Sequence, residues 1–77
     1  MIHTLAMGER CQTPQGEGVV NYWRYAPPDY RTIASVSVRL DSQMPRFIPY
    51  QGTVFPATDV RVQREGAWRP VATKGEA

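Results

Sequence analysis

A chain of 77 residues is enough for one small domain, and a domain of this size buries only about 60% of the surface that its unfolded chain exposes. The single cysteine, Cys11, excludes an intrachain disulfide, and no stretch approaches the roughly 20 apolar residues of a membrane helix. Nine basic and seven acidic residues give a net charge of +2, which argues against strong long-range attraction to polyanions.

These properties favour a soluble, cytoplasmic protein that does not interact with membranes. A lone cysteine is typical of a reducing compartment, and the N-terminal run MIHTLAM lacks the charged start and long apolar stretch of a signal peptide. Because a small domain without disulfides or metals has a thin core, we also expect weak self-association, as a homodimer.

Short strands separated by turns are expected in the first part of the chain. Residues 1–6 are expected to be loose, and the first strand is expected at 9–13. The run TPQG that follows has proline and glycine at the second and fourth positions of a type I turn. A second strand is expected at 18–23, where Gly18 indicates a bulge or a close approach of another backbone.

The strand expected at 34–41 has the clearest pattern in the sequence. Val36, Val38 and Leu40 alternate with polar residues, which is the period of two that a strand shows when one of its faces is buried. The remaining elements are expected in this order: a strand at 52–55, a helical turn at 56–59, strands at 60–64 and 67–71, and a frayed tail at 72–77.

The predicted fold class is all-β, because no window of helical length carries an apolar stripe with helical spacing. Seven prolines and six glycines divide the chain into five or six short antiparallel strands with one short helical turn. A sheet of this size without a covering helix removes its exposed edges if it curls into a small barrel. The expected core residues are Val20, Tyr22, Val36, Val38, Leu40, Val54, Val60 and Val62.

Three runs together resemble the SH3-like barrel of KOW and Tudor-type domains: MGERCQTPQGEGVV, VSVRLD and GTVFPATDVRV. The resemblance covers about residues 7–62 and implies a single SH3-like barrel over 7–71. In such barrels the long loop after the second strand often helps to form a ligand surface. The shared motifs are those of turns and strands, and this fold serves many unrelated functions.

The runs MGERCQTPQG and VFPATDV also resemble, more distantly, the plasmid-borne type II dihydrofolate reductases. Those enzymes are very small SH3-like barrels that tetramerise around a shared pore, which is lined by a Val-Gln-Ile-Tyr run. Here residues 52–55 read Gly-Thr-Val-Phe and lack the glutamine and the tyrosine hydroxyl that would handle cofactor and pterin. An oligomeric barrel enzyme of that type is therefore only a remote alternative.

Groups suited to catalysis or metal binding are scarce. His3 is the only histidine, and Cys11 is better explained as a small apolar residue of the first strand than as a nucleophile paired with His3. One histidine and one cysteine give no spacing that closes a tetrahedral metal site, and no glycine-rich phosphate loop precedes a helix. We therefore expect a protein that is not an enzyme and that holds neither cofactor nor metal.

The candidate binding surface comes from two aromatic runs, NYWRYAPPDYR at 21–31 and RFIPYQG at 46–52. Aromatic rings and guanidinium groups together suit nucleobases and phosphates, and they are also enriched in protein-binding hot spots. The predicted site consists of Trp23, Arg24, Tyr25, Tyr30, Arg31, Arg46, Phe47 and Tyr50. The alternative is that 21–31 is only a long loop held down by its own side chains.

These features predict a small, non-catalytic binding module that contacts nucleic acid, or a complex associated with nucleic acid, through the aromatic and arginine surface. A protein partner is supported about equally well, and the chain would then be an interaction or inhibitor module, such as an accessory protein of a mobile element. Salt dependence separates the two classes, because contacts to phosphates weaken linearly with the logarithm of salt concentration.

Overall fold

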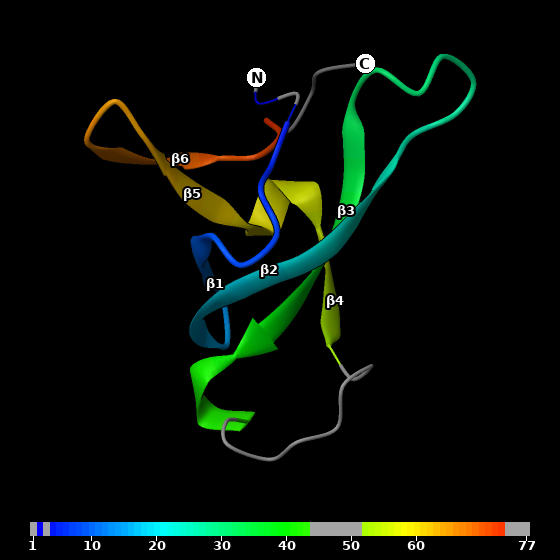
Figure 1. The fold of residues 1–77 in the computed structure, drawn as a ribbon. Helices are drawn as coiled ribbons and strands as arrows, with labels where there is room; N and C mark the ends of the chain where they lie inside the picture. The colour runs from blue at the N-terminus through cyan, green and yellow to red at the C-terminus, as the bar shows by residue number, and fades with distance from the viewer. Residues whose placement is uncertain (1, 3, 44–51, 74–77) are drawn as a thin grey trace.

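The computed structural model describes residue 2 and residues 4–43 and 52–73, which form one antiparallel sheet of six strands (Figure 1). The strands are β1 (Arg10–Thr13), β2 (Gly16–Tyr25), β3 (Ile33–Leu40), β4 (Thr53–Pro56), β5 (Arg61–Arg64) and β6 (Ala67–Pro70). Two 3-10 turns are present, η1 (Asp41–Gln43) and η2 (Ala57–Asp59). The all-β class and the helical turn before β5 are confirmed, and η1 is an additional turn. Within the described residues, no helix is long and apolar enough to cross a membrane.

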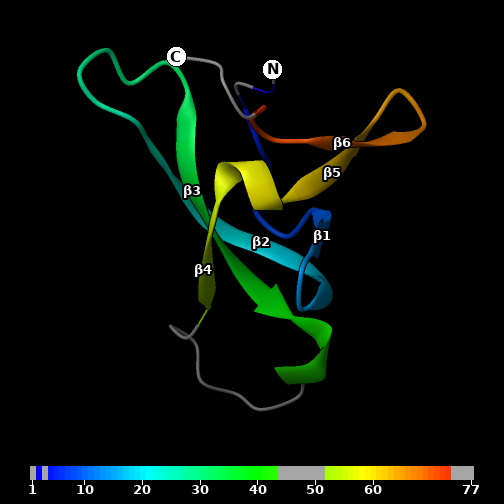
Figure 2. The same cartoon turned by 180° about the vertical axis from the view of Figure 1, so that it is seen from behind.

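The sheet is open. Its strand order is β4-β3-β2-β1-β5-β6, so β4 and β6 lie at opposite edges, and no ladder joins them in the part of the chain that the structure describes. The β2–β3 and β5–β6 hairpins diverge from each other, and η2 lies between them in both views (Figures 1 and 2). Closure into an SH3-like barrel therefore stays a prediction.

Strand β2 extends to Tyr25, two residues beyond its predicted end at Trp23. Tyrosine and tryptophan favour strands, and β3 provides partners for this part of β2. The connection that remains is closed by two backbone hydrogen bonds: the Ala26 amide donates to the Thr32 carbonyl at 2.7 Å, and the Tyr30 amide donates to the Ala26 carbonyl at 3.0 Å. Much of the predicted loop therefore belongs to the sheet.

One cluster of buried apolar side chains forms the core. Six of its members are predicted core residues: Val20, Val36, Val38, Leu40, Val60 and Val62. The others are Leu5, Cys11, Ile33, Phe55, Ala57 and Val71. Leu5 and Val71 come from segments that flank the sheet, and the Ile2 amide donates to the Val71 carbonyl at 3.3 Å. The packed unit thus includes residues that precede β1 in the chain and residues that follow β6.

The prediction that Tyr22 is buried is wrong, because β2 contains a β-bulge just before this residue. Val20 pairs with Val38, but Tyr22 pairs with Ser37, so β2 accommodates one extra residue, Asn21, at this point. An extra residue reverses the alternation of the side chains that follow it. Tyr22 consequently points away from the core and is 45% exposed.

The prediction that Val54 is buried is also wrong. Val54 pairs with Ser37 on the outer side of the sheet and is 58% exposed, whereas its neighbour Phe55 pairs with Val36 and is 6% exposed. Successive residues of a strand face opposite sides, so only one of these two side chains can enter the core. Burying the larger phenylalanine removes more apolar surface from water.

Gly18 permits the close approach of β3 that the sequence indicates. It pairs with Leu40, and a Cβ atom at this position would collide with the Arg39 carbonyl oxygen and lie 2.9 Å from the Leu40 Cα atom. Only glycine avoids this contact without a shift of the backbone.

Two arginine–carboxylate pairs tie distant segments together. The Arg64 Nη1 atom lies 2.7 Å from the Glu9 Oε1 atom. Arg10 donates two hydrogen bonds to the Asp41 carboxylate, of 2.9 and 2.7 Å. The Arg10 guanidinium holds the pKa of Asp41 below its usual range, and the carboxylate partners raise the pKa of both arginines.

Candidate functional site

The structure separates the residues of the predicted aromatic platform onto two faces of β2. Trp23 and Tyr25 lie on the side of the core, where Trp23 pairs with Val36 and Tyr25 pairs with Ile33. Both side chains are half-buried and pack against the core. Arg24 lies between them in the strand, so it points to the opposite face and is exposed. These three residues therefore do not form one surface.

The other predicted site residues lie elsewhere. Tyr30 and Arg31 are exposed in the connection between β2 and β3, where Tyr30 is 63% exposed and has a left-handed φ of 56°. The Arg31 amide donates to the Asp29 carboxylate at 3.3 Å. Arg46, Phe47 and Tyr50 lie outside the described residues.

A surface with the expected chemistry lies on the outer face of β2, β3 and β4, which we call the outer sheet face. Residues that are directly opposite in antiparallel strands share a face, so the pairing register defines its rows. The central row is Tyr22, Ser37 and Val54; the row on one side is Arg24, Ser35 and Pro56; the row on the other side is Val19 and Arg39. This face thus presents an exposed aromatic ring between two arginines.

The centre of the outer sheet face is tightly packed despite its exposed edges. Ser37 is only 2% exposed, because the backbone of Gly52 lies directly against it. A Cβ atom at Gly52 would collide with the Ser37 Oγ atom and lie 3.5 Å from the Asn21 Nδ2 atom. Asn21, Ser37 and Gly52 therefore lie close together at the centre of this face, where Ser37 stands between Tyr22 and Val54 in the central row.

Among the described residues, the charged side chains in the rows of this face are all positive. Its three rows contain Arg24 and Arg39 and, within the described residues, no carboxylate. The nearest acidic side chains along β2 and β3 are Glu17 and Asp41, which lie beyond the Arg39 row and contact Arg10 at 3.6 and 2.7 Å. The local charge is thus more positive than the net charge of the chain indicates.

Tyr22 and Val54 are surface residues that the sequence pattern does not identify. A strict period of two, continued from Val20, places Tyr22 inside, and nothing in the run VVNYW marks Asn21 as a bulge. The size of neighbouring side chains is the available signal. Trp23 is larger than Tyr22, Phe55 is larger than Val54, and the larger residue of each pair faces the core.

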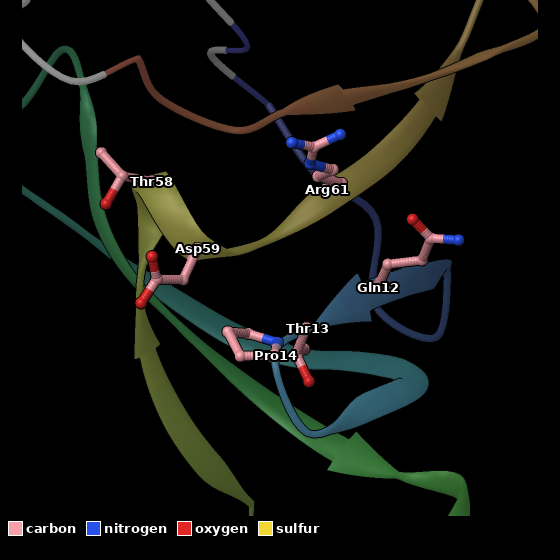
Figure 3. Close-up of a pocket in the computed structure, with 6 residues that line it drawn as sticks. All are labelled: Gln12, Thr13, Pro14, Thr58, Asp59 and Arg61. Atoms are coloured by element: carbon pink, nitrogen blue, oxygen red, sulfur yellow. The ribbon is translucent and has the colours of Figure 1, made fainter.

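A polar pocket of about 340 Å³ lies beside η2 and is separate from the outer sheet face (Figure 3). Its walls come from β1, the β1–β2 turn, η2 and β5. The lining residues are Gln12, Thr13, Pro14, Thr58, Asp59 and Arg61. The pocket therefore combines one carboxylate, one guanidinium, one amide and two hydroxyl groups.

The residues that the structure describes offer little for nucleophilic or metal chemistry. Burial raises the pKa of the Cys11 thiol to about 11, which disfavours the reactive thiolate. In the described part of the chain, no three His, Cys, Asp or Glu side chains come together in a way that could hold a metal ion. No protein-family model, curated protein or solved structure matches this chain.

Proposed function

We propose that this protein is a non-catalytic binding module that holds single-stranded nucleic acid on its outer sheet face. The observation that carries the proposal is the central row of this face, where Tyr22 is 45% exposed between rows that contain arginines and no described carboxylate. An exposed aromatic ring stacks on any base, and arginines beside it contact the phosphates.

The exposed ring favours a single strand over a duplex. Bases in a duplex stack on one another, so only an unpaired base can stack on Tyr22. The net charge of +2 also argues against strong binding to duplex DNA, in which phosphate contacts dominate the affinity. The resemblance to KOW and Tudor-type domains supports the same class, because some of those domains bind nucleic acid.

The test is fluorescence anisotropy with labelled nine-residue oligothymidylate and oligouridylate. We expect Tyr22→Ala to weaken binding by about 1–3 kcal/mol, the contribution of one stacked base, and Tyr22→Phe to retain most of the affinity. Tyr30→Ala is the matched control, because Tyr30 is an exposed tyrosine in the β2–β3 connection. Circular dichroism must first show that each variant keeps the β fold.

Arg24, one of the two arginines of the outer sheet face, is tested by its effect on salt dependence. We expect Arg24→Gln to reduce the slope of log K against log salt by about 0.7, the value for one phosphate contact on a single strand. Arg69→Gln is the matched control, because Arg69 is exposed on β6, and it should leave the slope unchanged. Equal slopes for wild type and Arg24→Gln would contradict the proposal.

A protein partner on the same face is the second candidate, and the exposure of Val54, at 58%, is the observation that favours it. An apolar contact there would give a nearly flat salt slope, and Tyr22→Ala would mainly speed dissociation.

The proposal also includes a cytoplasmic location and a weak homodimer. The lone cysteine supports the location, and the small size of the domain supports the dimer. Sedimentation that shows a strict monomer at high protein concentration would remove the dimer.

A further inference from the structure

The pocket beside η2 is lined by one carboxylate and one guanidinium, from residues that are two apart in the chain (Figure 3). Asp59 ends η2, Arg61 begins β5, and Val60 between them is extended, with φ −109° and ψ 132°. Val60 is fully buried, so Asp59 and Arg61 project to the side away from the core. Their Cα atoms are then roughly 7 Å apart, two residues along a strand.

Both charged side chains are available to a ligand. Asp59 and Arg61 are exposed and line the same pocket, and no ion pair joins either of them to another described residue. The Thr13 hydroxyl, in contrast, accepts a hydrogen bond from the Gln15 amide at 3.1 Å and donates one to the Gly16 carbonyl at 2.8 Å. Thr13 therefore shapes the wall, while Asp59 and Arg61 carry the free hydrogen-bonding capacity.

The remaining lining residues add one apolar group and two polar groups to the pocket. The Pro14 ring forms an apolar wall on the side of the β1–β2 turn, and Gln12 and Thr58 supply an amide and a hydroxyl (Figure 3). A second depression of about 260 Å³ shares Thr58, Asp59 and Arg61 and continues past Pro70 towards Thr73. The space thus has a central charged pair with room on both sides of it.

The mixed charge restricts the chemistry of the ligand. A phosphate that approaches Arg61 meets the repulsion of Asp59, and a cation that approaches Asp59 meets that of Arg61. A neutral ligand that carries donors and acceptors on one edge satisfies both groups. Among the bases, guanine presents two adjacent donors, N1–H and the N2 amino group, beside the acceptors O6 and N7.

We propose that the Asp59–Arg61 pocket binds a guanine base. The carboxylate accepts hydrogen bonds from N1–H and the N2 amino group, and the guanidinium donates to O6 and N7. Adenine fits poorly, because its N1 acceptor would face the Asp59 carboxylate, which is also an acceptor. Its amino group at position 6 would face the Arg61 guanidinium, which is also a donor. Pro14 packs against the face of the ring, and the second depression takes the sugar.

Guanine has two sources, a free nucleoside or nucleotide and a guanine within a single strand. The free form tests the pocket without any reliance on the proposed function of the outer sheet face. The strand-borne form deepens that function, and this part of the inference rests on it.

The first experiment follows the amide resonances of the full-length protein during titration with guanosine, inosine and adenosine. We expect guanosine to shift the amides of Gln12, Thr58, Asp59 and Arg61. Inosine lacks only the N2 amino group, so it should bind about tenfold more weakly, the effect of losing a hydrogen bond to a charged group. Adenosine should leave these amides unchanged.

Variants then assign the contacts. Asp59→Asn should bring the ratio of guanosine to inosine affinity towards one, because the partner of the N2 amino group is altered. Arg61→Gln should weaken both nucleosides equally, because both carry O6 and N7. Glu65→Gln, at an exposed carboxylate in the β5–β6 turn, is the control and should keep the wild-type ratio. Equal affinity of the wild type for all three nucleosides, or an unchanged ratio in Asp59→Asn, would overturn the proposal.

The second experiment distinguishes the sources. The central base of a nine-residue oligothymidylate is replaced by guanine, and binding is compared in wild type and Asp59→Asn. A gain that only the wild type shows supports guanine within a strand, whereas guanosine binding without such a gain supports the free form. If oligothymidylate does not bind at all while guanosine does, the proposed function of the outer sheet face fails and the pocket stands. If guanosine and the guanine-containing strand both fail to engage the pocket, the inference is wrong.

Discussion

The thiol of Cys11 shows how burial decides the chemistry of a single side chain. Cys11 pairs with Gly18 on one side and Val62 on the other, and it is fully buried. Loss of hydration raises the pKa of the thiol to about 11, so the thiol stays protonated at neutral pH. We expect iodoacetamide to modify the native protein very slowly and the urea-unfolded protein rapidly, as followed by mass spectrometry. Equal rates in the two states would show that Cys11 is accessible.

The ion pair of Asp41 makes a second prediction for a single residue. Its pKa is lowered by the hydrogen bonds from Arg10, so the stability that the pair contributes is present above the ordinary value of 3.8 and is lost as the pH falls through the lower folded value. In urea unfolding between about pH 5 and pH 2, Asp41→Asn should therefore lose less stability than wild type. Asp29→Asn, at another exposed aspartate, is the control. A greater loss of stability in Asp41→Asn than in Asp29→Asn over this pH range would contradict the assignment.

Among the elements, β3 and β4 test which side of the sheet is buried. Val38 is fully buried and Val54 is 58% exposed, so the same substitution has different costs. Val38→Ala should lower the free energy of unfolding by about 1–3 kcal/mol. Val54→Ala should change it by less than about 0.5 kcal/mol, as is usual for surface positions. Chemical denaturation measures both, and similar losses would mean that the face of β4 is assigned wrongly.

The contrast between β3 and β2 shows what the sequence can predict. In β3 the alternation of Val36, Val38 and Leu40 with polar residues is unbroken, and the structure buries all three. In β2 the bulge at Asn21 reverses the alternation, and it depends on the pairing with β3 rather than on any local signal. A local pattern therefore predicts the strand, whereas its face after the bulge depends on contacts that are distant in sequence.

The same dependence on contacts that are distant in sequence explains why the predicted site differs from the surface that the structure shows. The sequence marks 21–31 as rich in aromatic residues and arginines, and two of the predicted residues, Trp23 and Tyr25, pack against the core. Arg24 is exposed as expected, but its neighbours on the outer sheet face come from β3 and β4. The sequence does not indicate the pocket at Asp59 and Arg61, because it forms only where the β1–β2 turn and η2 come together.

The whole molecule carries two surfaces that differ in their chemistry. The outer sheet face has an exposed aromatic ring with arginines, which suits stacking and phosphates. The pocket beside η2 has opposite charges among its lining residues, which suits the edge of a neutral base. The two surfaces are tested independently, because substitutions at Tyr22 and at Asp59 affect different elements.

Binding at the outer sheet face is best measured by a map of amide chemical shifts during titration of the full-length protein with unlabelled nine-residue oligothymidylate. We expect the largest shifts at Tyr22, Arg24, Ser35, Ser37 and Val54, which come from three strands but share one face. We also expect these shifts to be lost in Tyr22→Ala while the rest of the spectrum stays dispersed. Shifts confined to the connection at residues 26–32, or no shifts at any strand concentration, would contradict the claim that the outer sheet face binds single-stranded nucleic acid.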